Sequence, residues 1–527
     1  MDLRRPVWHL PVDVTISDQA PASISERLGT WGAALLATAM LAALQMSFPG
    51  LYDLDSYFHA RATTDLAVHG VQTKFPQAAF STWAEVYSDK DFLFHAILTP
   101  LISHDSLVQG GKWGVIVFDL LLFLSVAFAV RSLRMRFGFV WVLLLVGASA
   151  YYVTRLVSLR PHIFGLAFVA VEIALVARDR WKALFVVSAL HVWAHSSFPI
   201  VAALYGIRLL VALLQRETWP IRSGVAIVAG FVVASLAHPY FPNNLDIAYA
   251  VVFRLAGHLW GGAAEIPTAA FGSELRPMGM PTFLLAAPGW VPAALGLVAM
   301  VFARRGRGWS TRDLFLLFAT LAFTALAFAS RRFLDMFVLS AVLLAGGLWT
   351  TLSADRSLRE LIVSKPVLAG GSSVAVAACL VWGLTVAWTD LPESFANQSY
   401  ADIFRPTVAQ LDFFADPQDV VYHPTWREFS FLYAFRPNGR YISGLDPMFL
   451  HAKSPDLFKK SWRLSRGFSK QPHLVLARDF GARWVFVTTE KRFTAFRRLL
   501  ARTPGIDRVF EGPGAEIWAV APLEPPT

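Results

Sequence analysis

Two aspartates, Asp53 and Asp55, directly follow the first long apolar run of the chain. Asp55, His59 and Thr63 are spaced four residues apart, so a helix over this segment places all three on one face. A carboxylate at the boundary between lipid and water can act as a general base or bind a metal ion. The structural alternative is an acid that caps the helix N-terminus, where the dipole favours negative charge. We expect this helix to be amphipathic and to lie on the outer membrane surface.

The composition indicates that membrane helices position these residues. Of the 527 residues, 55% are hydrophobic and 16% are charged, whereas soluble domains carry about 25% charged residues. These values exclude a disordered chain, a coiled coil and an ordinary soluble enzyme. The net charge of +10 gives no reason to expect a nucleic-acid partner, because membrane proteins gather Lys and Arg on their cytoplasmic loops.

Long apolar runs predict the membrane spans, since most are near the ~20 residues that cross a bilayer. They cover residues 28–48, 113–130, 137–154, 161–177, 183–214, 223–237, 282–303, 314–330, 333–350 and 366–389. The run 183–214 is long for one helix, and we interpret it as two short helices that meet at 195–199. Two crossings there place the clusters of Arg and Lys on one side of the membrane. The prediction is about eleven spans with the N-terminus inside.

The predicted fold is a polytopic α-helical membrane protein with a C-terminal extracytoplasmic α/β domain. It consists of a cytoplasmic tail (1–27), a multi-span domain (28–389) and the α/β domain (390–527). Two long outer loops, 49–112 and 238–281, interrupt the otherwise short connections. Long loops on a tightly connected bundle indicate a function.

Charged residues reappear after about residue 390, and the apolar segments become shorter. This pattern is typical of a small α/β domain. We predict strands at 419–424, 440–446 and 482–489, helices at 454–467 and 490–502, and a terminal hairpin at 507–522.

The segment "DSYFHARAT", which begins at Asp55, resembles the "DPWFNYRAT" type of motif in the catalytic subunit of oligosaccharyltransferase, a GT-C class membrane glycosyltransferase. Arg61, Ala62 and Thr63 also match, whereas Ser56 replaces the family's proline. In that family the aspartate follows the first span, faces the outer side and acts at the reaction centre. The resemblance therefore implies a GT-C-like fold and a catalytic role for Asp55.

The family's second acidic motif lies in the outer turn after the third span and helps to bind a divalent metal. The corresponding turn, "RLVSLRPHIFG", has no acid, and Arg160 and His162 stand near that place. Arg160 could instead bind a donor phosphate, because its guanidinium suits phosphate oxygens; the alternative is an interfacial anchor. A cation such as Mg²⁺ or Mn²⁺ stays an open expectation, with Asp55 and Glu265 as its candidate ligands.

The loop 238–281 contains "GGAAEIPTAAFGSEL", which resembles a family loop motif such as "SVSEHQPT". Glu265, Pro267 and Thr268 match, but Ala264 stands where the family has serine. In the family this glutamate approaches the acceptor and the metal, and the resemblance implies the same for Glu265. The alternative is an acid on a solvated loop.

Arg331 and Arg332 begin an apolar run on the outer side. The family has an arginine at the matching helix start that contacts the lipid-linked pyrophosphate. The resemblance implies that one of the two holds the donor phosphate, and Arg160 could join it through its own guanidinium. Snorkelling to lipid headgroups is the alternative, although two outer arginines run against the positive-inside bias.

Further polar residues could face a cavity on the outer side, where Asp55 is also expected. His195 lies in the break between the two short helices, and either faces the cavity or is hydrogen-bonded within the bundle. Asp91, in "SDKDFLFHAI", either lines an acceptor entrance or belongs to a solvated loop edge. The other residues expected at the cavity are Asp53, His59 and His162.

The resemblance covers about residues 28–350, and the family's "WWDYG" motif, which reads the acceptor sequence, does not occur in 390–527. We therefore predict a bilayer-embedded glycosyltransferase that moves a sugar from a polyprenyl phosphate or pyrophosphate donor to a glycan, lipid or protein acceptor. The alternatives are a protein oligosaccharyltransferase with a diverged acceptor reader, or a non-enzymatic transporter or flippase of lipid-linked sugars. The expected location is the inner or plasma membrane, with the active face extracytoplasmic.

Overall fold

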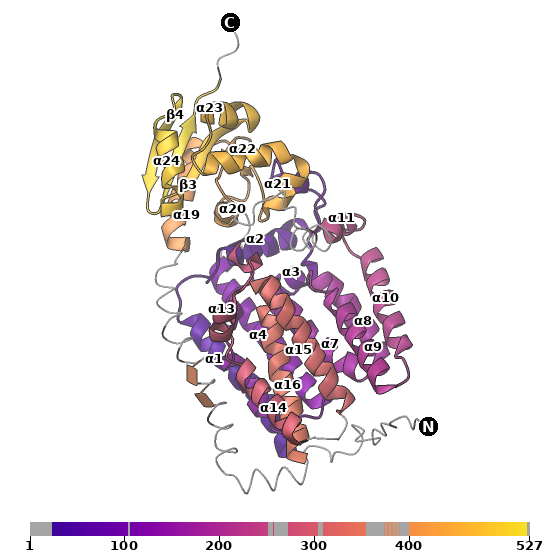
Figure 1. Ribbon diagram of the computed structural model, residues 1–527. Coiled ribbons are helices and arrows are strands. Elements are labelled where there is room, and N and C mark those ends of the chain that lie inside the picture. Colours follow the sequence, from indigo (N-terminus) through magenta and orange to yellow (C-terminus); the bar gives the residue numbers. More distant parts are fainter. Residues whose placement is uncertain are drawn as a thin grey trace, which may run out of the picture.

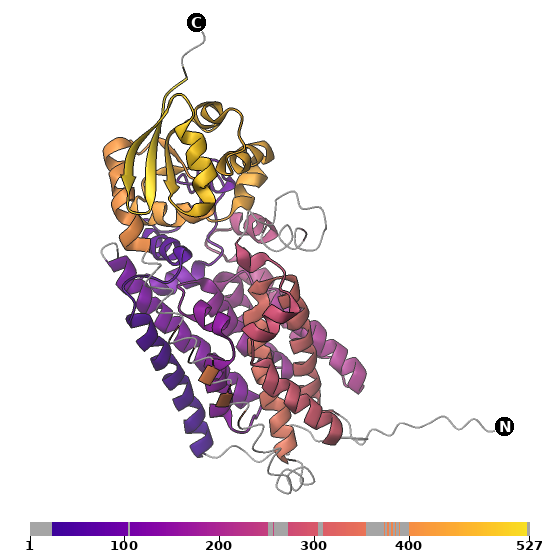
Figure 2. The same cartoon turned by 60° about the vertical axis from the view of Figure 1, so that its left-hand side comes forward.

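The computed structural model describes residues 24–103, 106–250, 272–303, 309–354 and 400–523, together with isolated positions between these ranges. The described residues of 24–354 build a helical bundle, and those of 400–523 form a smaller α/β region (Figure 1). The α/β region is seated on one end of the bundle, and Figure 2 shows this arrangement from a second direction.

The helices of the bundle coincide with the predicted apolar runs. They are α1 (Ile24–Met46), α4 (Leu107–Ser132), α5 (Gly138–Gly147), α6 (Ala150–Leu156), α7 (Pro161–Ala177), α8 (Trp181–Ala194), α9 (Ile200–Gln215), α10 (Ile221–Leu236), α13 (Met280–Ala286), α14 (Trp290–Ala303), α15 (Thr311–Ala329) and α16 (Leu334–Ala354). The run 183–214 is divided into α8 and α9, as predicted, with the break at 195–199.

Several of these helices suit a bilayer. Within the described residues, four are long and apolar enough to cross one: α1, α4, α15 and the helical segment Arg331–Ala354. The pair α13 and α14 is bent by 97° and becomes a fifth if it forms one broken span. The count of about eleven spans stays a prediction, and most of the run 366–389 lies outside the described residues.

Burial differs between the inner and outer helices of the bundle. α16 packs against α14 and α15 and is buried along most of its length. α10 instead exposes a row of apolar side chains, namely Val225, Val228 and Val232. Lipid tails solvate such a surface, whereas water does not.

Three short helices, α2 (Leu54–His69), α3 (Phe92–Leu98) and α11 (Asn243–Tyr249), lie between the bundle and the α/β region (Figure 1). α2 contacts α4 on the bundle side and α20 (Trp426–Phe435) on the other. The Arg61 guanidinium donates to the carbonyl oxygen of Ala434 at 2.7 and 3.0 Å, and Tyr433 donates to Asp65 at 2.5 Å. α2 is therefore largely buried between α4 and α20 and does not expose one polar face, whereas its position at the membrane surface stays a prediction.

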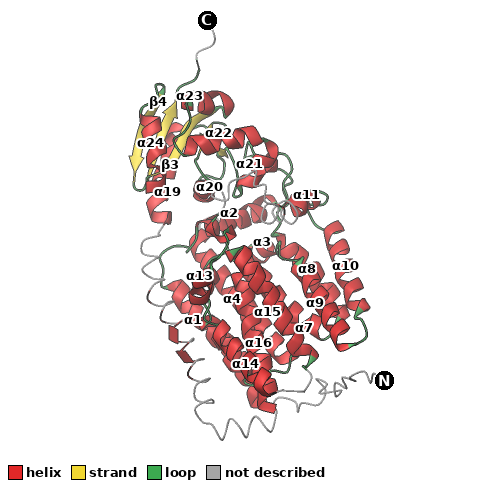
Figure 3. Ribbon diagram, in the orientation of Figure 1, coloured by secondary structure: helices red, strands yellow, loops and turns green. Residues whose placement is uncertain are grey.

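The α/β region contains a five-stranded sheet in the order β2-β1-β3-β5-β4, and all five strands lie in this part of the chain (Figure 3). The strands are β1 (Val420–Tyr422), β2 (Arg440–Tyr441), β3 (Ala482–Thr488), β4 (Ile506–Gly512) and β5 (Ala515–Val520). β1 pairs in parallel with β2 and β3, whereas β5 pairs antiparallel with β3 and β4. The predicted strands and the terminal hairpin are confirmed, although β2 has only two residues.

The helices of this region are α19 (Tyr400–Phe414), α20, α21 (Pro447–Lys453), α22 (Pro455–Ser465), α23 (Pro472–Leu474) and α24 (Thr494–Ala501). α22 and α24 confirm the two predicted helices, and the others are additional. A capping signal precedes α20, where the backbone N–H of Thr425 donates to Glu428 at 2.9 Å. The extracytoplasmic placement of the region stays a prediction.

Candidate active site

A polar cavity lies where the bundle meets the α/β region. Its walls come from α2, the start of α7, the break between α8 and α9, η6 (Ser273–Leu275), η7 (Arg331–Phe333) and the segment before α21. The ionisable residues that line it are Asp55, His59, Lys90, Arg155, Arg160, His162, His195, Glu274, Arg332 and Asp446. The fold thus brings distant parts of the chain to one site.

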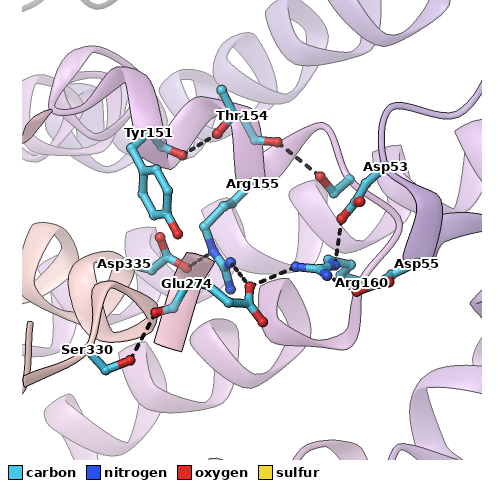
Figure 4. A network of polar contacts seen from close by, with 10 residues as sticks. Asp53, Asp55, Tyr151, Thr154, Arg155, Arg160, Glu274, Ser330 and Asp335 are labelled. Carbon is cyan, nitrogen blue, oxygen red and sulfur yellow. Dashed lines mark hydrogen bonds and ion pairs between the residues drawn. The ribbon is translucent and has the colours of Figure 1, made fainter. Parts of the chain in front are cut away.

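Arg160 precedes the first turn of α7 and is held by three carboxylates (Figure 4). Its Nε lies 2.7 Å from Asp53 Oδ2, its Nη1 lies 2.9 Å from Glu274 Oε2, and its Nη2 forms an ion pair with Asp55. A guanidinium presents five N–H donors in a planar fork, so one arginine can serve three acids.

A second arginine extends this network. Arg155, near the end of α6, lies 2.5 Å from Asp335 through its Nε and 3.0 Å from Glu274 through its Nη1. Glu274 is therefore shared by Arg155 and Arg160 (Figure 4). These contacts tie together α6, α7, η6 and the start of α16.

The arginines also set the protonation of the network. Burial alone would raise the pKa of Glu274, but the charges of Arg160 and Arg155 outweigh burial and hold this pKa well below its ordinary value. Burial would lower the pKa of Arg160, and the carboxylates of Asp53 and Glu274 raise it instead. Both Glu274 and Arg160 are consequently charged at neutral pH.

The described carboxylates do not fit a metal ion. Asp53, Asp55 and Glu274 each pair with Arg160, which places a positive charge where a cation would have to bind. Over the described ranges, no three or more His, Cys, Asp or Glu side chains form a group that could hold a metal. Glu265, the other expected ligand, lies outside the described residues.

The cavity brings together most of the predicted residues. Those that line it are Asp55, His59, Arg160, His162, His195 and Arg332. Asp53 joins them through its ion pair with Arg160. Arg331 and Asp91 are not among the lining residues; Asp91 instead pairs with Lys90, which does line the cavity. Of the two arginines of η7, Arg332 lines the cavity, and the donor contact of either one stays a prediction.

Sequence reasoning missed Arg155, Glu274 and Asp446. A signal for Glu274 exists, because the family loop motif joins serine to glutamate and the Ser–Glu pair of η6 keeps this order, whereas alanine precedes Glu265. Arg155 and Asp446 carry no comparable signal. Arg155 meets Asp335 across 180 residues of sequence, and only folding brings such a pair together.

A buried hydrogen-bonded chain ends at His59. Asp89 Oδ2 lies 2.6 Å from His95 Nδ1, and His95 Nε2 lies 2.9 Å from His59 Nδ1. All three side chains are buried. α2 supplies His59 and α3 supplies His95, so the packing of these two helices builds the chain.

No protein-family model and no curated protein sequence matches this chain. Its fold, however, is similar to that of solved structures. One is the archaeal oligosaccharyltransferase AglB from Archaeoglobus fulgidus, in complex with an inhibitory peptide and a dolichol-phosphate. The TM-score is 0.60 at 10% sequence identity, over 88% of this chain and 70% of AglB.

Two further structures are similar. ArnT from Cupriavidus metallidurans, bound to undecaprenyl phosphate, gives a TM-score of 0.50 at 14% identity, over 94% of this chain and 99% of ArnT. The arabinofuranosyltransferase AftD from Mycobacteria gives 0.52 at 13% identity, over 96% of this chain and 42% of AftD. All three neighbours are GT-C glycosyltransferases, and this chain therefore has the fold of the GT-C class of membrane glycosyltransferases, as its sequence motifs predict.

Proposed function

We propose that this protein is an integral membrane glycosyltransferase that moves a sugar from a polyprenyl phosphate or pyrophosphate donor to a glycan, lipid or protein acceptor. The observation that carries the proposal is the polar cavity, where Asp55 lies among the cations Lys90, Arg155, Arg160 and Arg332. Such cations bind phosphate oxygens. Structures of the same fold hold dolichol-phosphate in AglB and undecaprenyl phosphate in ArnT.

The cations would stabilise the negative charge that develops on the phosphate as the sugar leaves. We assign the phosphate contact first to Arg332, which lines the cavity at the start of α16. Arg160 already serves three carboxylates. Its role is to fix those carboxylates and to supply the positive charge that the family resemblance gives to a metal. No step of this proposal passes through Mg²⁺ or Mn²⁺.

Asp55 would hold the acceptor. Its Oδ2 pairs with Arg160, while its Oδ1 is buried and has no hydrogen-bond partner among the described residues. A buried carboxylate oxygen without a partner is costly, so substrate binding is the natural source of the missing donor. Oδ1 accepts a hydrogen bond from the attacking group of the acceptor and orients this group toward the sugar.

The cavity would open on the extracytoplasmic face of the inner or plasma membrane. α7 begins at the cavity and ends next to Arg178, and α9 ends next to Arg216 at the same remote side of the bundle. Arginines at the end away from the cavity agree with the positive-inside rule if that end is cytoplasmic.

The test supplies the purified protein in lipid vesicles with a panel of radiolabelled polyprenyl-linked sugars and measures release of the polyprenyl phosphate. Asp55→Asn should lower release by about 100-fold or more, because the amide no longer orients the acceptor or balances Arg160. Asp65→Asn is the matched control, since Asp65 lies on the same helix but contacts Tyr433 away from the cavity. Release by Asp55→Asn at the wild-type rate would contradict the assignment. Saturable donor binding without release by the wild type would favour a transporter.

A further inference from the structure

Two hydrogen-bonded chains end at histidines that line the polar cavity. The first is the chain from Asp89 through His95 to His59. The second runs from Glu172 to His191 at 2.8 Å, from His191 to the Ser197 hydroxyl at 2.9 Å, and from this hydroxyl to His195 at 2.8 Å. In both chains the cavity histidine uses Nδ1 for the contact, so Nε2 is the ring nitrogen left for a ligand.

The first chain allows His59 to carry its proton on Nδ1. Burial would raise the pKa of Asp89, but its contacts with His95 Nδ1 at 2.6 Å and with the Asp91 backbone N–H at 3.0 Å lower it. The ionised Asp89 therefore accepts, and His95 donates through Nδ1–H. When His95 carries a single ring proton, its Nε2 accepts and His59 donates through Nδ1–H.

His59 is consequently left with a lone pair on Nε2, which makes no hydrogen bond to any residue that the structure describes. Burial lowers the pKa of His59 well below its ordinary value. The free ring is therefore neutral and its lone pair is available. Proton uptake at Nε2 leaves the imidazolium backed by His95 and the carboxylate of Asp89.

In the second chain, the proton of the cavity histidine lies on Nε2 and not on Nδ1. The backbone N–H of Ser197 donates to His195 Nδ1 at 3.1 Å. This nitrogen therefore holds the lone pair, and a neutral His195 carries its proton on Nε2. His195 offers the cavity a hydrogen-bond donor, whereas His59 offers an acceptor.

We infer that His59 is a further catalytic residue, which takes the proton from a hydroxyl group of the acceptor, and that Asp89 and His95 are positioning residues behind it. The inference rests on the proposed function and deepens it. Asp55 orients the hydroxyl, and His59 receives its proton. His195, as a donor, contacts an oxygen of the donor substrate.

The hydroxyl oxygen of the acceptor forms a bond to the anomeric carbon of the sugar, and the bond from this carbon to the phosphate oxygen breaks. The electron pair of the broken bond leaves with the phosphate, and the hydroxyl proton moves to His59 Nε2. The proton then passes to the departing phosphate or to water.

The chemistry favours an acceptor of the alcohol class, such as a glycan or a lipid hydroxyl. A hydroxyl oxygen keeps its lone pairs for attack, and a neutral imidazole can remove its proton as the bond forms. An amide nitrogen shares its lone pair with the carbonyl group. His59 alone therefore provides too little activation for an asparagine side chain.

The test compares His59→Gln with His195→Gln, a matched pair that makes the same substitution on the two cavity histidines. Initial rates are measured over ranges of donor and of hydroxyl acceptor. His59→Gln should lower kcat by about 100-fold or more while the donor KM changes little. His195→Gln should mainly raise the donor KM, by about tenfold. A wild-type kcat in His59→Gln would overturn the inference.

Two further variants separate chemistry from folding. His59→Ala should regain part of its kcat when imidazole is added to the buffer, because the added base enters the vacated space. Asp89→Asn keeps His59 in place but weakens the chain behind it, and should lower kcat by about tenfold or more with an unchanged donor KM. If Asp89→Asn behaves as wild type, the positioning role is wrong. Failure of the proposed function looks different, since the wild type itself then releases no polyprenyl phosphate.

Discussion

The polar cavity has two unlike walls. The cationic wall consists of Arg155, Arg160 and Arg332, and carboxylates inside the protein hold the first two. The histidine wall consists of His59 and His195, each held through Nδ1 by hydrogen bonds. The positive charges of arginines attract a phosphate from several directions, whereas a ring nitrogen must point at one proton. Binding the donor and moving the proton thus need different surroundings, and one cavity contains both.

The chain also builds the two walls differently. Arg160 meets Glu274 across 114 residues of sequence, whereas His59 meets His95 across 36. The cationic wall therefore exists only when α7 and η6 have come together. The first histidine chain needs little more than the packing of α2 against α3.

The largest expected effect comes from breaking the cationic wall at Arg160. Arg160→Ala leaves Asp53, Asp55 and Glu274 without their shared charge, and we expect the release rate to fall by about 100- to 1,000-fold. Arg160→Lys should recover only part of the rate, because an ammonium cannot reproduce the planar fork. The release assay in vesicles measures both variants.

Adding EDTA to the release assay tests whether a metal ion contributes to the rate. If Arg160 supplies the positive charge that a metal would otherwise provide, EDTA leaves the wild-type release rate unchanged. A rate that collapses with EDTA and returns with Mg²⁺ or Mn²⁺ would show that a metal binds despite Arg160. Wild-type activity in Arg160→Lys would show that the fork geometry is unimportant.

The matched pair at η7 should give a smaller effect. Arg332 lines the cavity and Arg331 does not. Arg332→Ala should raise the donor KM by about tenfold or more, which corresponds to the loss of a hydrogen bond to a charged group. Arg331→Ala should change it by about twofold or less. Donor titrations in the release assay distinguish the two, and equal effects would contradict the assignment of Arg332.

The smallest effect concerns the contact that holds the α/β region over both walls. Arg61→Ala removes two buried hydrogen bonds to Ala434, and should lower stability by about 1–3 kcal/mol. Lys453→Ala is the comparison, since its ion pair with Glu85 also joins these regions but is exposed. Thermal unfolding in detergent should show a lower melting temperature for Arg61→Ala and little change for Lys453→Ala. Equal melting temperatures for Arg61→Ala and the wild type would contradict this prediction.

The sequence by itself determined the local features of this protein. Apolar runs predicted the helices of the bundle, the break at 195–199 separated α8 from α9, and the glycine-containing turn predicted the terminal hairpin. The spacing of Asp55 and His59 placed both on one helix face, and both line the cavity. These features depend on periodicity and turn chemistry over a few neighbouring residues, which a sequence displays directly.

Only the tertiary structure decided how these pieces form a site. It placed Arg160 among three carboxylates, and it brought Arg332 and Glu274, but not Arg331, to the lining of the cavity. It also covered α2 with α20, where an amphipathic surface helix was expected. The physical reason is that ion pairs and hydrogen bonds act over a few ångströms in space, while their partners lie tens to hundreds of residues apart in the chain.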